Sequence, residues 1–595
     1  MAFQHYILVC GGTGCESNKA DAIFKKLLHE VEQHNVKDTV QVVKTGCFGF
    51  CAKGPIVKVL PDESFYVEVS PEDTREIIAE HIVKGRPVDR LLYKNAESKE
   101  YARVEDIDFY QKQFRIVLRN CGFINPEEID EYIARDGYAA LEKVLFEMEP
   151  DDVIAELKTA KLRGRGGAGF PTWMKWNFTK QSPGDVKYVV CNADEGDPGA
   201  YMDRSVLEGD PHTVLEAMAI CGRTIGANQG YIYIRAEYPL AIRRLERAIT
   251  QATEMGLLGK DILGSGFDFD IELRLGAGAF VCGEETALLA SIEGERGMPK
   301  PRPPFPSVKG LWGKPTVINN VETWANVPVI ITRGADWFAK IGTEDSTGTK
   351  VFALTGKIAN SGLVEVPMGT PLRDIIFNIG GGIPDGKRFK AVQTGGPSGG
   401  VITEDHLDTP IDYTHLQQLG SIMGSGGMIV MDESDCIVDV AKFYLEFTVE
   451  ESCGKCAPCR VGGRKLHNIL TRITNGNGTQ EDIEKMQVIG RAMQKASLCG
   501  LGQTAPNPIL STLRYFRAEY DAHIDKQICP AGVCKDLIHF EIIPDKCIGC
   551  GLCARRCPVG CISGERREPH EIDQSQCIKC GECFAVCKFD AVLRA

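Results

Sequence analysis

The spacing of apolar residues predicts that the chain begins with a small α/β domain. Residues 17–35, SNKADAIFKKLLHEVEQHN, carry apolar side chains at helical intervals. The runs TVQVVK (39–44) and PIVKVL (55–60) have the β-branched composition of strands. A helix and strands that present two cysteine loops at one end are therefore expected before about residue 85.

The middle of the chain alternates predicted strands and helices. The run PDDVIAELKTAKLRG (150–164) starts with proline and acids and ends in basic residues, and it keeps four apolar residues near one helix face: Val153, Ile154, Leu157 and Leu162. Residues 187–204 predict a strand with a polar end, and residues 273–294 predict a glycine-rich strand that turns into a helix. Residues 348–382 contain two short β-type runs and then a helix, as a β-grasp domain would.

Length and charge limit the kinds of partner that are expected. A chain of 595 residues should fold into several domains, and a net charge of −13 would repel a nucleic-acid backbone. The N-terminal residues contain no basic leader, and the sequence has no run of 18 apolar residues. We therefore expect a cytoplasmic chain without nucleic-acid or membrane partners, bound to other protein subunits.

One glycine-rich stretch, KLRGRGGAGFPTWMKW (161–176), matches G-x-G-x-x-G at Gly164, Gly166 and Gly169. In a Rossmann dinucleotide site this motif follows a strand, whereas here it follows a predicted helix. The loop can still bind phosphate through its backbone amides, helped by the positive charge of Arg163, Arg165 and Lys175. From these residues alone, a phosphate site and a plain helix cap followed by a turn are equally acceptable.

Cysteine is the most informative residue type. Four of the 24 cysteines precede residue 52, and sixteen lie from Cys436 onward. Closely spaced thiols in a chain without a secretory signal favour metal binding over disulfides.

The strongest pattern is a duplicated C-x2-C-x2-C-x3-C run at the C-terminus. In bacterial two-cluster ferredoxins the fourth cysteine of each run ligates the other cluster. This rule predicts two [4Fe-4S] ligand sets, the first being Cys547, Cys550, Cys553 and Cys587, and the second Cys577, Cys580, Cys583 and Cys557. Lys588 stands where the second run of such ferredoxins usually has proline, which affects loop geometry but not ligation.

Two further sets of four cysteines are predicted. Cys453, Cys456 and Cys459 form a tight loop, and a predicted helix delivers Cys499; this set suits a [4Fe-4S] cluster, with zinc as the alternative. Near the N-terminus, C-x4-C and C-x3-C spacings bring in Cys10, Cys15, Cys47 and Cys51. This last pattern resembles the thioredoxin-like [2Fe-2S] ferredoxins, with a redox dithiol or zinc as alternatives.

The glycine-rich middle, from about residue 120 to 510, resembles the flavin- and NADH-binding subunit of respiratory complex I, through GRGGAGF, NADEGD, CGEE and NNVET. Together with the cysteine patterns and the composition, this resemblance implies a multidomain α/β chain: a thioredoxin-like [2Fe-2S] domain (1–85), a linker (86–119), a Rossmann-like FMN and NAD(P) domain (120–335) and a β-grasp (SLBB) domain (336–435). A helical bundle with one [4Fe-4S] cluster (436–520) and a zinc-clipped ferredoxin domain with two (521–595) would follow. The β-grasp domain could be a mere spacer, since its sequence shows no chemistry.

The same resemblance assigns residues to cofactors. FMN would be lined by Gly164, Gly166, Lys175, Asn192, Asp194, Gly283, Asn319, Asn320 and Thr323. Adenine would stack between Phe170, Phe178 and Phe305, and acids near the nicotinamide and ribose would be Glu195, Asp197, Glu284 and Glu285, of which Glu195 and Asp197 are the catalytic candidates. Asp197, Phe280 and Arg302 replace the usual glutamate, tyrosine and lysine. The shorter acid and the guanidinium would tolerate a 2′-phosphate, so NAD and NADP both remain possible.

With both ferredoxin-type arms added, the layout is similar to the β subunit of electron-bifurcating [FeFe] hydrogenases. This similarity implies a hydrogenase catalytic subunit, a small thioredoxin-like [2Fe-2S] subunit and ferredoxin as partners. NAD(P)-linked formate dehydrogenases and NADP-reducing hydrogenases share the layout, so a diaphorase subunit without bifurcation is the alternative. A stand-alone diaphorase and an electron-relay scaffold with a vestigial flavin site are further alternatives.

The remaining cysteines suggest a zinc site. Cys529 and Cys534 form a C-x4-C knuckle before the ferredoxin runs, and Cys561 and His570 follow the first run. Three thiolates and one imidazole make a common tetrahedral zinc set, which would fix the ferredoxin arm. The other buried-type cysteines, Cys436 among them, are expected only to pack.

Overall fold

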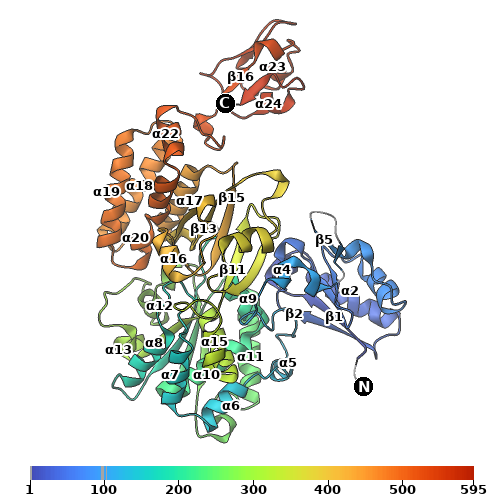
Figure 1. The fold of residues 1–595 in the computed structure, drawn as a ribbon, viewed down its shortest axis with the longest axis vertical. Helices are drawn as coiled ribbons and strands as arrows, with labels where there is room; N and C mark the ends of the chain where they lie inside the picture. Colours follow the sequence, from blue (N-terminus) through green and yellow to red (C-terminus); the bar gives the residue numbers. More distant parts are fainter. Residues whose placement is uncertain (1–2, 96–99, 102, 595) are drawn as a thin grey trace. The chain divides into compact units, whose positions relative to one another are not determined.

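The protein, as a computed structural model, is described for residues 3–95, 100–101 and 103–594 and consists of two compact units, residues 1–430 and 431–595 (Figure 1). Residues 96–99 and 102 of the expected linker lie outside the described part. Each unit is described separately below.

The first unit opens with a four-stranded sheet in the order β2-β1-β3-β4. Strand β1 pairs in parallel with β2 and antiparallel with β3. Helix α2 (Ala20–Gln33) buries Ala20, Ile23, Leu27 and Val31, which share one face. Strands β1 to β4 are His5–Cys10, Val40–Thr45, Val57–Leu60 and Ser64–Tyr66. The predicted helix is confirmed as α2, and the two predicted strands are confirmed as β2 and β3.

The second sheet of this unit is parallel, with the strand order β10-β7-β8-β9. Its strands are Tyr188–Ala193, Gln229–Arg235, Asp270–Gly276 and Thr316–Asn320 for β7 to β10. Because the strands are parallel, their carboxyl ends share one edge, where ligands usually bind in open α/β sheets. The main helices around this sheet are α7 (Pro150–Thr159), α8 (Thr172–Gln181), α9 (Met202–Gly209), α10 (Pro211–Ile225), α11 (Pro239–Glu254), α12 (Glu285–Ile292) and α14 (Val321–Arg333).

A third sheet has the order β12-β11-β15-β13-β14. Its strands β11 to β15 are Thr349–Gly356, Gly362–Pro367, Phe389–Thr394, Gly400–Thr403 and Gly427–Asp432. The two β-type runs expected here form β11 and β12, and the helix expected after them is a short π-helical segment, Asp374–Ile379.

Buried charges join this third sheet to the rest of the first unit. The carboxylate of Glu365 on β12 accepts N–H bonds of 2.9 Å from Ile116, Val117 and Leu118. Lys350 on β11 pairs with Glu322 of α14, and both side chains are fully buried. Since breaking one partner of such a pair leaves a buried charge, these contacts hold the sheet firmly against the parallel sheet's helices.

The second unit combines a helical bundle with a small cysteine-rich domain (Figure 1). The bundle contains α17 (Ile437–Glu450), α18 (Ala457–Thr474), α19 (Gln480–Ala496), α21 (Asn507–Tyr515) and α22 (Arg517–Asp525). The small domain contains two short antiparallel strand pairs and the helices α23 (Leu552–Arg556) and α24 (Glu582–Val586). Among the described residues, no helix is both long enough and apolar enough to cross a bilayer.

Candidate functional site

The glycine-rich loop of residues 163–171 lies between α7 and α8. The helix predicted before the loop is confirmed, so the loop lacks the strand-to-helix setting of an ordinary dinucleotide motif. A Cβ on Gly166 would lie 2.9 Å from Cβ of Asn320, and the N–H of Arg165 donates to Oγ1 of Thr323 at 2.8 Å. The absence of a side chain at Gly166 therefore lets the loop backbone meet the end of β10.

Helix α16 (Tyr413–Gln418), between strands β14 and β15 of the third sheet, contributes a clamp on this loop. The hydroxyl of Tyr413 donates to the carbonyl of Gly164 at 2.6 Å, and the guanidinium of Arg163 lies 4.4 Å from the Tyr413 ring. Gly169 has a φ of +62°, and a Cβ there would lie 2.7 Å from the same ring. Tyr413 is thus a site residue that sequence reasoning missed, because 249 positions separate it from Gly164.

Polar side chains gather where β7 and β10 end. Asn192 and Asn320 are neighbours in the parallel register. Asn192 donates to the carbonyl of Gly283 at 2.8 Å, and its own Oδ1 accepts the N–H of Asp194 at 3.1 Å. Asn320 donates to Asp203 at 2.5 Å and caps α14 with its oxygen. The structure therefore brings together the asparagines of the predicted flavin site; Asn319 is also buried on β10.

One lysine lies between the loop and the acids of α12. Nζ of Lys175 donates to the carbonyl of Ile318 at 3.1 Å and lies 3.7 Å from a carboxylate oxygen of Glu285, which also pairs with Arg302. Burial lowers the pKa of Lys175, and the charge of Glu285 opposes that shift. Glu284 instead caps α12, accepting N–H bonds of 2.9 and 3.0 Å from its first turn. Glu284 therefore caps the helix, and Glu285 pairs with the two cations Lys175 and Arg302.

The two catalytic candidates are held by different elements. Glu195 is buried and accepts backbone N–H bonds from Asp203 and Arg204, while burial raises its pKa. Asp197 accepts a 2.5 Å hydrogen bond from the hydroxyl of Ser425, which lies just before β15. Burial raises the pKa of Asp197 to about 6, and the bond from Ser425 opposes that rise. Ser425 is the second site residue that the sequence did not reveal.

The predicted adenine-stacking aromatics are exposed. Phe170, Phe178 and Phe305 are 42%, 43% and 53% exposed, so their rings are open to a ligand. Phe305 begins the short helix Pro306–Lys309, which packs on α8, the helix that carries Phe178. Phe280 begins a short turn of 3₁₀ helix, Phe280–Gly283, before α12.

The four N-terminal cysteines converge at one end of the first sheet. Cys10 lies at the end of β1, where its interactions with Cys15 and Cys47 and its burial raise the pKa of its thiol, and Sγ of Cys47 lies 3.9 Å from Sγ of Cys51. The loop between Cys10 and Cys15 contacts α9, because Thr13 donates to the buried carboxylate of Glu208 at 3.0 Å through its N–H. This thiol set therefore lies against the helix that follows the acidic loop of Glu195.

The thiols predicted in the bundle surround one helix end. Cys453 and Cys456 precede α18, Cys459 lies in its first turn, and Cys499 directly precedes the short helix α20 (Gly500–Thr504). Helix α20 packs on Cys459, since a Cβ on Gly502 would lie 2.9 Å from Cβ of Cys459.

The small C-terminal domain contains two cavities, each lined by four thiols. One cavity is lined by Cys547, Cys550, Cys553 and Cys587. The other is lined by Cys557, Cys577, Cys580 and Cys583. The structure thus groups the thiols in the crossed arrangement that the duplicated runs predicted, with the last cysteine of each run in the cavity of the other.

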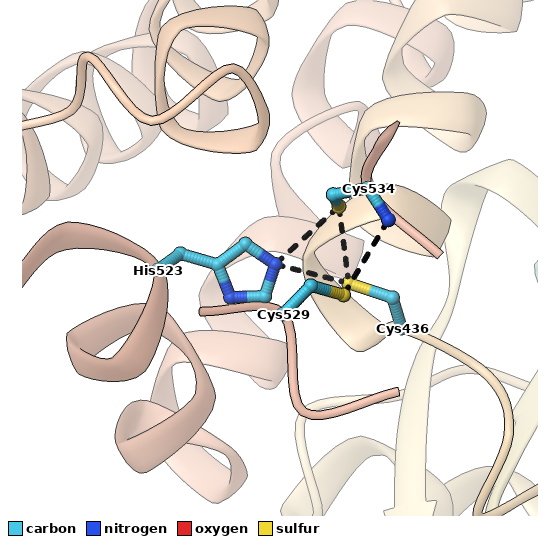
Figure 2. Close-up of side chains that lie close together, drawn as sticks. All are labelled: Cys436, His523, Cys529 and Cys534. Carbon is cyan, nitrogen blue, oxygen red and sulfur yellow. Dashed lines mark hydrogen bonds between the residues drawn. The ribbon is translucent and has the colours of Figure 1, made fainter. Parts of the chain in front are cut away.

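A further group of four ligand-type side chains lies in the bundle. Figure 2 shows Cys436, His523, Cys529 and Cys534 pointing toward one another, with all donor atoms within 4.8 Å. Nε2 of His523 lies 3.3 Å from Sγ of Cys436 and 3.4 Å from Sγ of Cys534, and those two sulfurs are 3.7 Å apart. A tetrahedral zinc with bonds of about 2.3 Å to sulfur requires sulfur atoms roughly 3.8 Å apart, so the spacing fits.

The imidazole of this group is oriented for coordination. Nδ1 of His523 donates to the carbonyl of Glu519 at 2.7 Å, which leaves Nε2 facing the thiols. Sγ of Cys529 accepts the N–H groups of Val533 and Cys534 at 3.3 and 3.5 Å. All four ligand-type side chains are buried.

The grouping expected for zinc from the sequence is corrected in two of its four members. Cys561 and His570 lie instead in the ferredoxin-type domain, where Cys561 is 3.4 Å from Cys557 and His570 lines the cavity of Cys547. Cys436 is packed in the bundle core as expected, and it also contacts His523 and Cys534. The error has a plain cause, since Cys436 is 87 positions from His523 and helix packing alone brings them together.

Family models match five segments of the chain. They are a thioredoxin-like [2Fe-2S] ferredoxin (residues 2–81), the Nuo51 FMN-binding domain (157–329), an SLBB domain (351–402), the NADH-ubiquinone oxidoreductase-F iron-sulfur binding region (439–523) and a 4Fe-4S dicluster domain (541–591). The fold and these matches define a multidomain α/β flavoprotein with iron–sulfur domains, as predicted.

Curated relatives and a solved structure agree with these matches. The NADP-reducing hydrogenase subunit HndC of Solidesulfovibrio fructosivorans is 61% identical over 81% of this chain and 98% of its own. The F subunit of the NADH-quinone oxidoreductase of Aquifex aeolicus is 47% identical over 70% of this chain and 96% of its own. An NAD⁺-reducing [NiFe]-hydrogenase structure has a TM-score of 0.62 at 29% identity, covering 88% of this chain and 85% of that one.

The chain therefore belongs to the family of NADH-quinone oxidoreductase F subunits, which includes subunits of hydrogenases. It is an FMN- and NAD(P)H-linked iron–sulfur oxidoreductase subunit of the diaphorase type, with [2Fe-2S] and [4Fe-4S] domains.

Proposed function

We propose that this chain is the diaphorase subunit of a hydrogenase complex, exchanging hydride with NAD(H) or NADP(H) at FMN and single electrons with its partners. The observation that carries the proposal is that one chain combines the clamped glycine loop with four separate groups of thiols. FMN takes electrons in pairs and iron–sulfur clusters take them singly, so a protein that holds both converts between the two.

The residues of the proposed flavin and nucleotide site divide by task. FMN is held by the backbone of Gly164 and Gly166 and by Lys175, Asn192, Asp194, Gly283, Asn319, Asn320 and Thr323. The nucleotide is bound by Phe170, Phe178, Phe280, Phe305, Arg302, Glu284 and Glu285, with Glu195 and Asp197 beside the reacting ring. No protein acid or base is needed for hydride transfer. The aromatic side chains therefore act by stacking on the nucleotide, and the charged side chains act through the electrostatic field at the reacting rings.

The flavin site is tested by adding one methyl group. Gly166→Ala places a Cβ 2.9 Å from Asn320, whereas Gly427→Ala, in β15, meets no atom within 4 Å. We expect Gly166→Ala to lose bound FMN and dye reduction by NADH, and Gly427→Ala to keep both. Full FMN content in Gly166→Ala would contradict the proposed position of the flavin.

We propose that NADPH is accepted as well as NADH. The supporting observation is that the cations Arg302 and Lys175 both pair with Glu285, one of the acids assigned to the nucleotide site. Two positive side chains therefore lie where a 2′-phosphate would need them. The S. fructosivorans relative is named NADP-reducing. Arg302→Lys should lower kcat/KM for NADPH more than for NADH. An equal fall for both nucleotides would show that Arg302 does not distinguish NADPH from NADH.

We propose that the four thiol groups hold one [2Fe-2S] and three [4Fe-4S] clusters. The [2Fe-2S] ligands are Cys10, Cys15, Cys47 and Cys51, and the bundle set is Cys453, Cys456, Cys459 and Cys499. The ferredoxin sets are those that line its two cavities. The reconstituted chain should hold about 14 iron atoms by this ligand count.

We further propose flavin-based electron bifurcation with ferredoxin and an [FeFe]-hydrogenase-type subunit, assisted by a small thioredoxin-like [2Fe-2S] subunit. The support is that family models place two cluster-bearing arms, at residues 2–81 and 541–591, outside the FMN-binding domain and the oxidoreductase-F iron-sulfur region. The purified complex should form H2 from NADH only when reduced ferredoxin is also supplied. Full-rate H2 formation from NAD(P)H alone would favour an NADP-reducing hydrogenase without coupling, and a co-purifying formate dehydrogenase subunit would exclude both.

We propose that Cys436, His523, Cys529 and Cys534 hold one zinc ion. The support is their spacing, their burial and the orientation of His523. Zinc would bind the start of α17, the helix α22 and the loop that follows it into one unit, from which the ferredoxin domain continues.

Metal analysis of two variants can distinguish the ligand set seen in the structure, which includes Cys436, from the set expected from the sequence, which includes Cys561. Metal analysis should find about one zinc per chain beyond iron, given one four-ligand site. Cys436→Ser should lose zinc with iron retained, and Cys561→Ala should keep both. Zinc-free protein with full iron would refute the site, and loss of zinc in Cys561→Ala but not in Cys436→Ser would restore the grouping expected from the sequence.

A further inference from the structure

The two cavities of the ferredoxin-type domain are built from equivalent residues thirty positions apart. Cys547 and Cys577 take the same place in the two cavities, and so do Ile548 and Ile578. The last cysteines of the runs, Cys557 and Cys587, are likewise thirty positions apart. Each residue that lines one cavity can therefore be compared with its equivalent thirty positions away in the other.

One difference is a fifth thiol. Cys561 lines the cavity of Cys557, whereas the equivalent residue in the other cavity is Ala591. Sγ of Cys561 lies 3.4 Å from Sγ of Cys557, within hydrogen-bond distance for sulfur, and Cys561 is 6% exposed. In the other cavity, Sγ of Cys587 accepts the backbone N–H of Ala591 at 3.4 Å. The side-chain contact is thus specific to one cavity.

A second difference marks the other cavity. A Cβ on Gly551 would lie 3.6 Å from Nε2 of His570, and a Cβ on the equivalent Gly581 would lie 3.5 Å from Cζ of Phe540. An imidazole on one side thus replaces a phenyl ring on the other. Cys561 and His570 therefore distinguish the two cavities and supply a matched pair of variants.

We propose that Cys561 donates an S–H···S hydrogen bond to Cys557 and so raises the reduction potential of the cluster in its cavity above that of the other. This inference rests on the proposed ligand sets. Hydrogen bonds to ligand sulfurs are among the factors that set cluster potentials, because they stabilise the more negative, reduced cluster. An electron in this domain would then rest on the cluster of the Cys557 cavity.

The geometry also determines which thiol is the ligand. Cys557 is equivalent to Cys587, and no cysteine stands beside Cys587 at the position of Ala591. The common framework therefore assigns ligation to Cys557 and hydrogen bonding to Cys561.

The test uses the full-length chain with all clusters, in redox titrations followed by EPR. Cys561→Ala copies Ala591, so the fold should tolerate it. We expect one [4Fe-4S] reduction step to move to a more negative potential with iron content unchanged. Cys561→Ser keeps a hydroxyl donor and should shift the potential less. His570→Phe copies Phe540 in the other cavity and should leave that step in place.

Three outcomes would overturn the inference. Unchanged potentials in Cys561→Ala would show that the thiol does not act on the cluster. Loss of about four iron atoms, one cluster, would make Cys561 a ligand. A shift of the same step in His570→Phe would make the effect general to the domain. The proposed ligand sets fail separately if deletion of residues 540–595 leaves iron content unchanged.

Discussion

Replacing Ser425 with alanine removes the 2.5 Å hydrogen bond that its hydroxyl donates to the carboxylate of Asp197. Burial raises the pKa of Asp197 to about 6 with that bond in place. A hydrogen bond to a charged group contributes about 1.5–3 kcal/mol, and about 1.4 kcal/mol corresponds to one pKa unit. Because Asp197 is partly exposed, water replaces part of the lost bond, and we expect a rise of about one unit.

The sign follows from which form Ser425 stabilises. The hydroxyl donates to the ionised carboxylate, so its loss favours protonation and raises the pKa. If the carboxylate is the active form, kcat/KM for NADH rises with pH through about 6 in the parent protein. In Ser425→Ala the same rise should occur near pH 7, by the estimate of one unit.

The assay is dye reduction by NADH across the acid range, with bound FMN measured in every sample. Ser425→Thr keeps a hydroxyl and should retain the parent profile, and Asp197→Asn should lose the rise near pH 6 altogether. An unchanged profile in Ser425→Ala would refute the reasoning. A rise that persists in Asp197→Asn would assign the titration to another group, such as Glu195, whose pKa burial also raises.

Three other changes test the clamp, the nucleotide acids and the ferredoxin arm. Tyr413→Phe keeps the ring over Arg163 but leaves the carbonyl of Gly164 without its 2.6 Å bond, at a cost of about 1–2 kcal/mol. If the free loop then relaxes and FMN binding must restore it, FMN should bind up to about five- to thirtyfold more weakly in a fluorescence titration. Glu285→Gln should raise KM for NADH with FMN content unchanged; loss of flavin would mean that the roles are reversed. Deletion of residues 540–595 should remove about eight iron atoms by atomic absorption, and unchanged iron would contradict the ferredoxin sets.

Local features of this protein were predictable from the sequence because they depend on residues close together in the chain. The helix before Gly164, the strand Tyr188–Ala193 and the helix opened by the Glu284–Glu285 pair follow from periodicity and capping over a few residues. The duplicated cysteine runs predicted which thiols share a cavity, since a repeat carries its own geometry.

Other features were decided only by tertiary packing. Nothing near Tyr413 or Ser425 in the sequence indicates a role, because each contacts a loop more than two hundred positions earlier in the chain. The group of Cys436 and His523 was missed for the same reason, since spacing patterns report ligands only when one loop supplies them. Helix packing placed a cysteine before α17 beside a histidine on α22, and a single sequence carries no periodic signal of that distance.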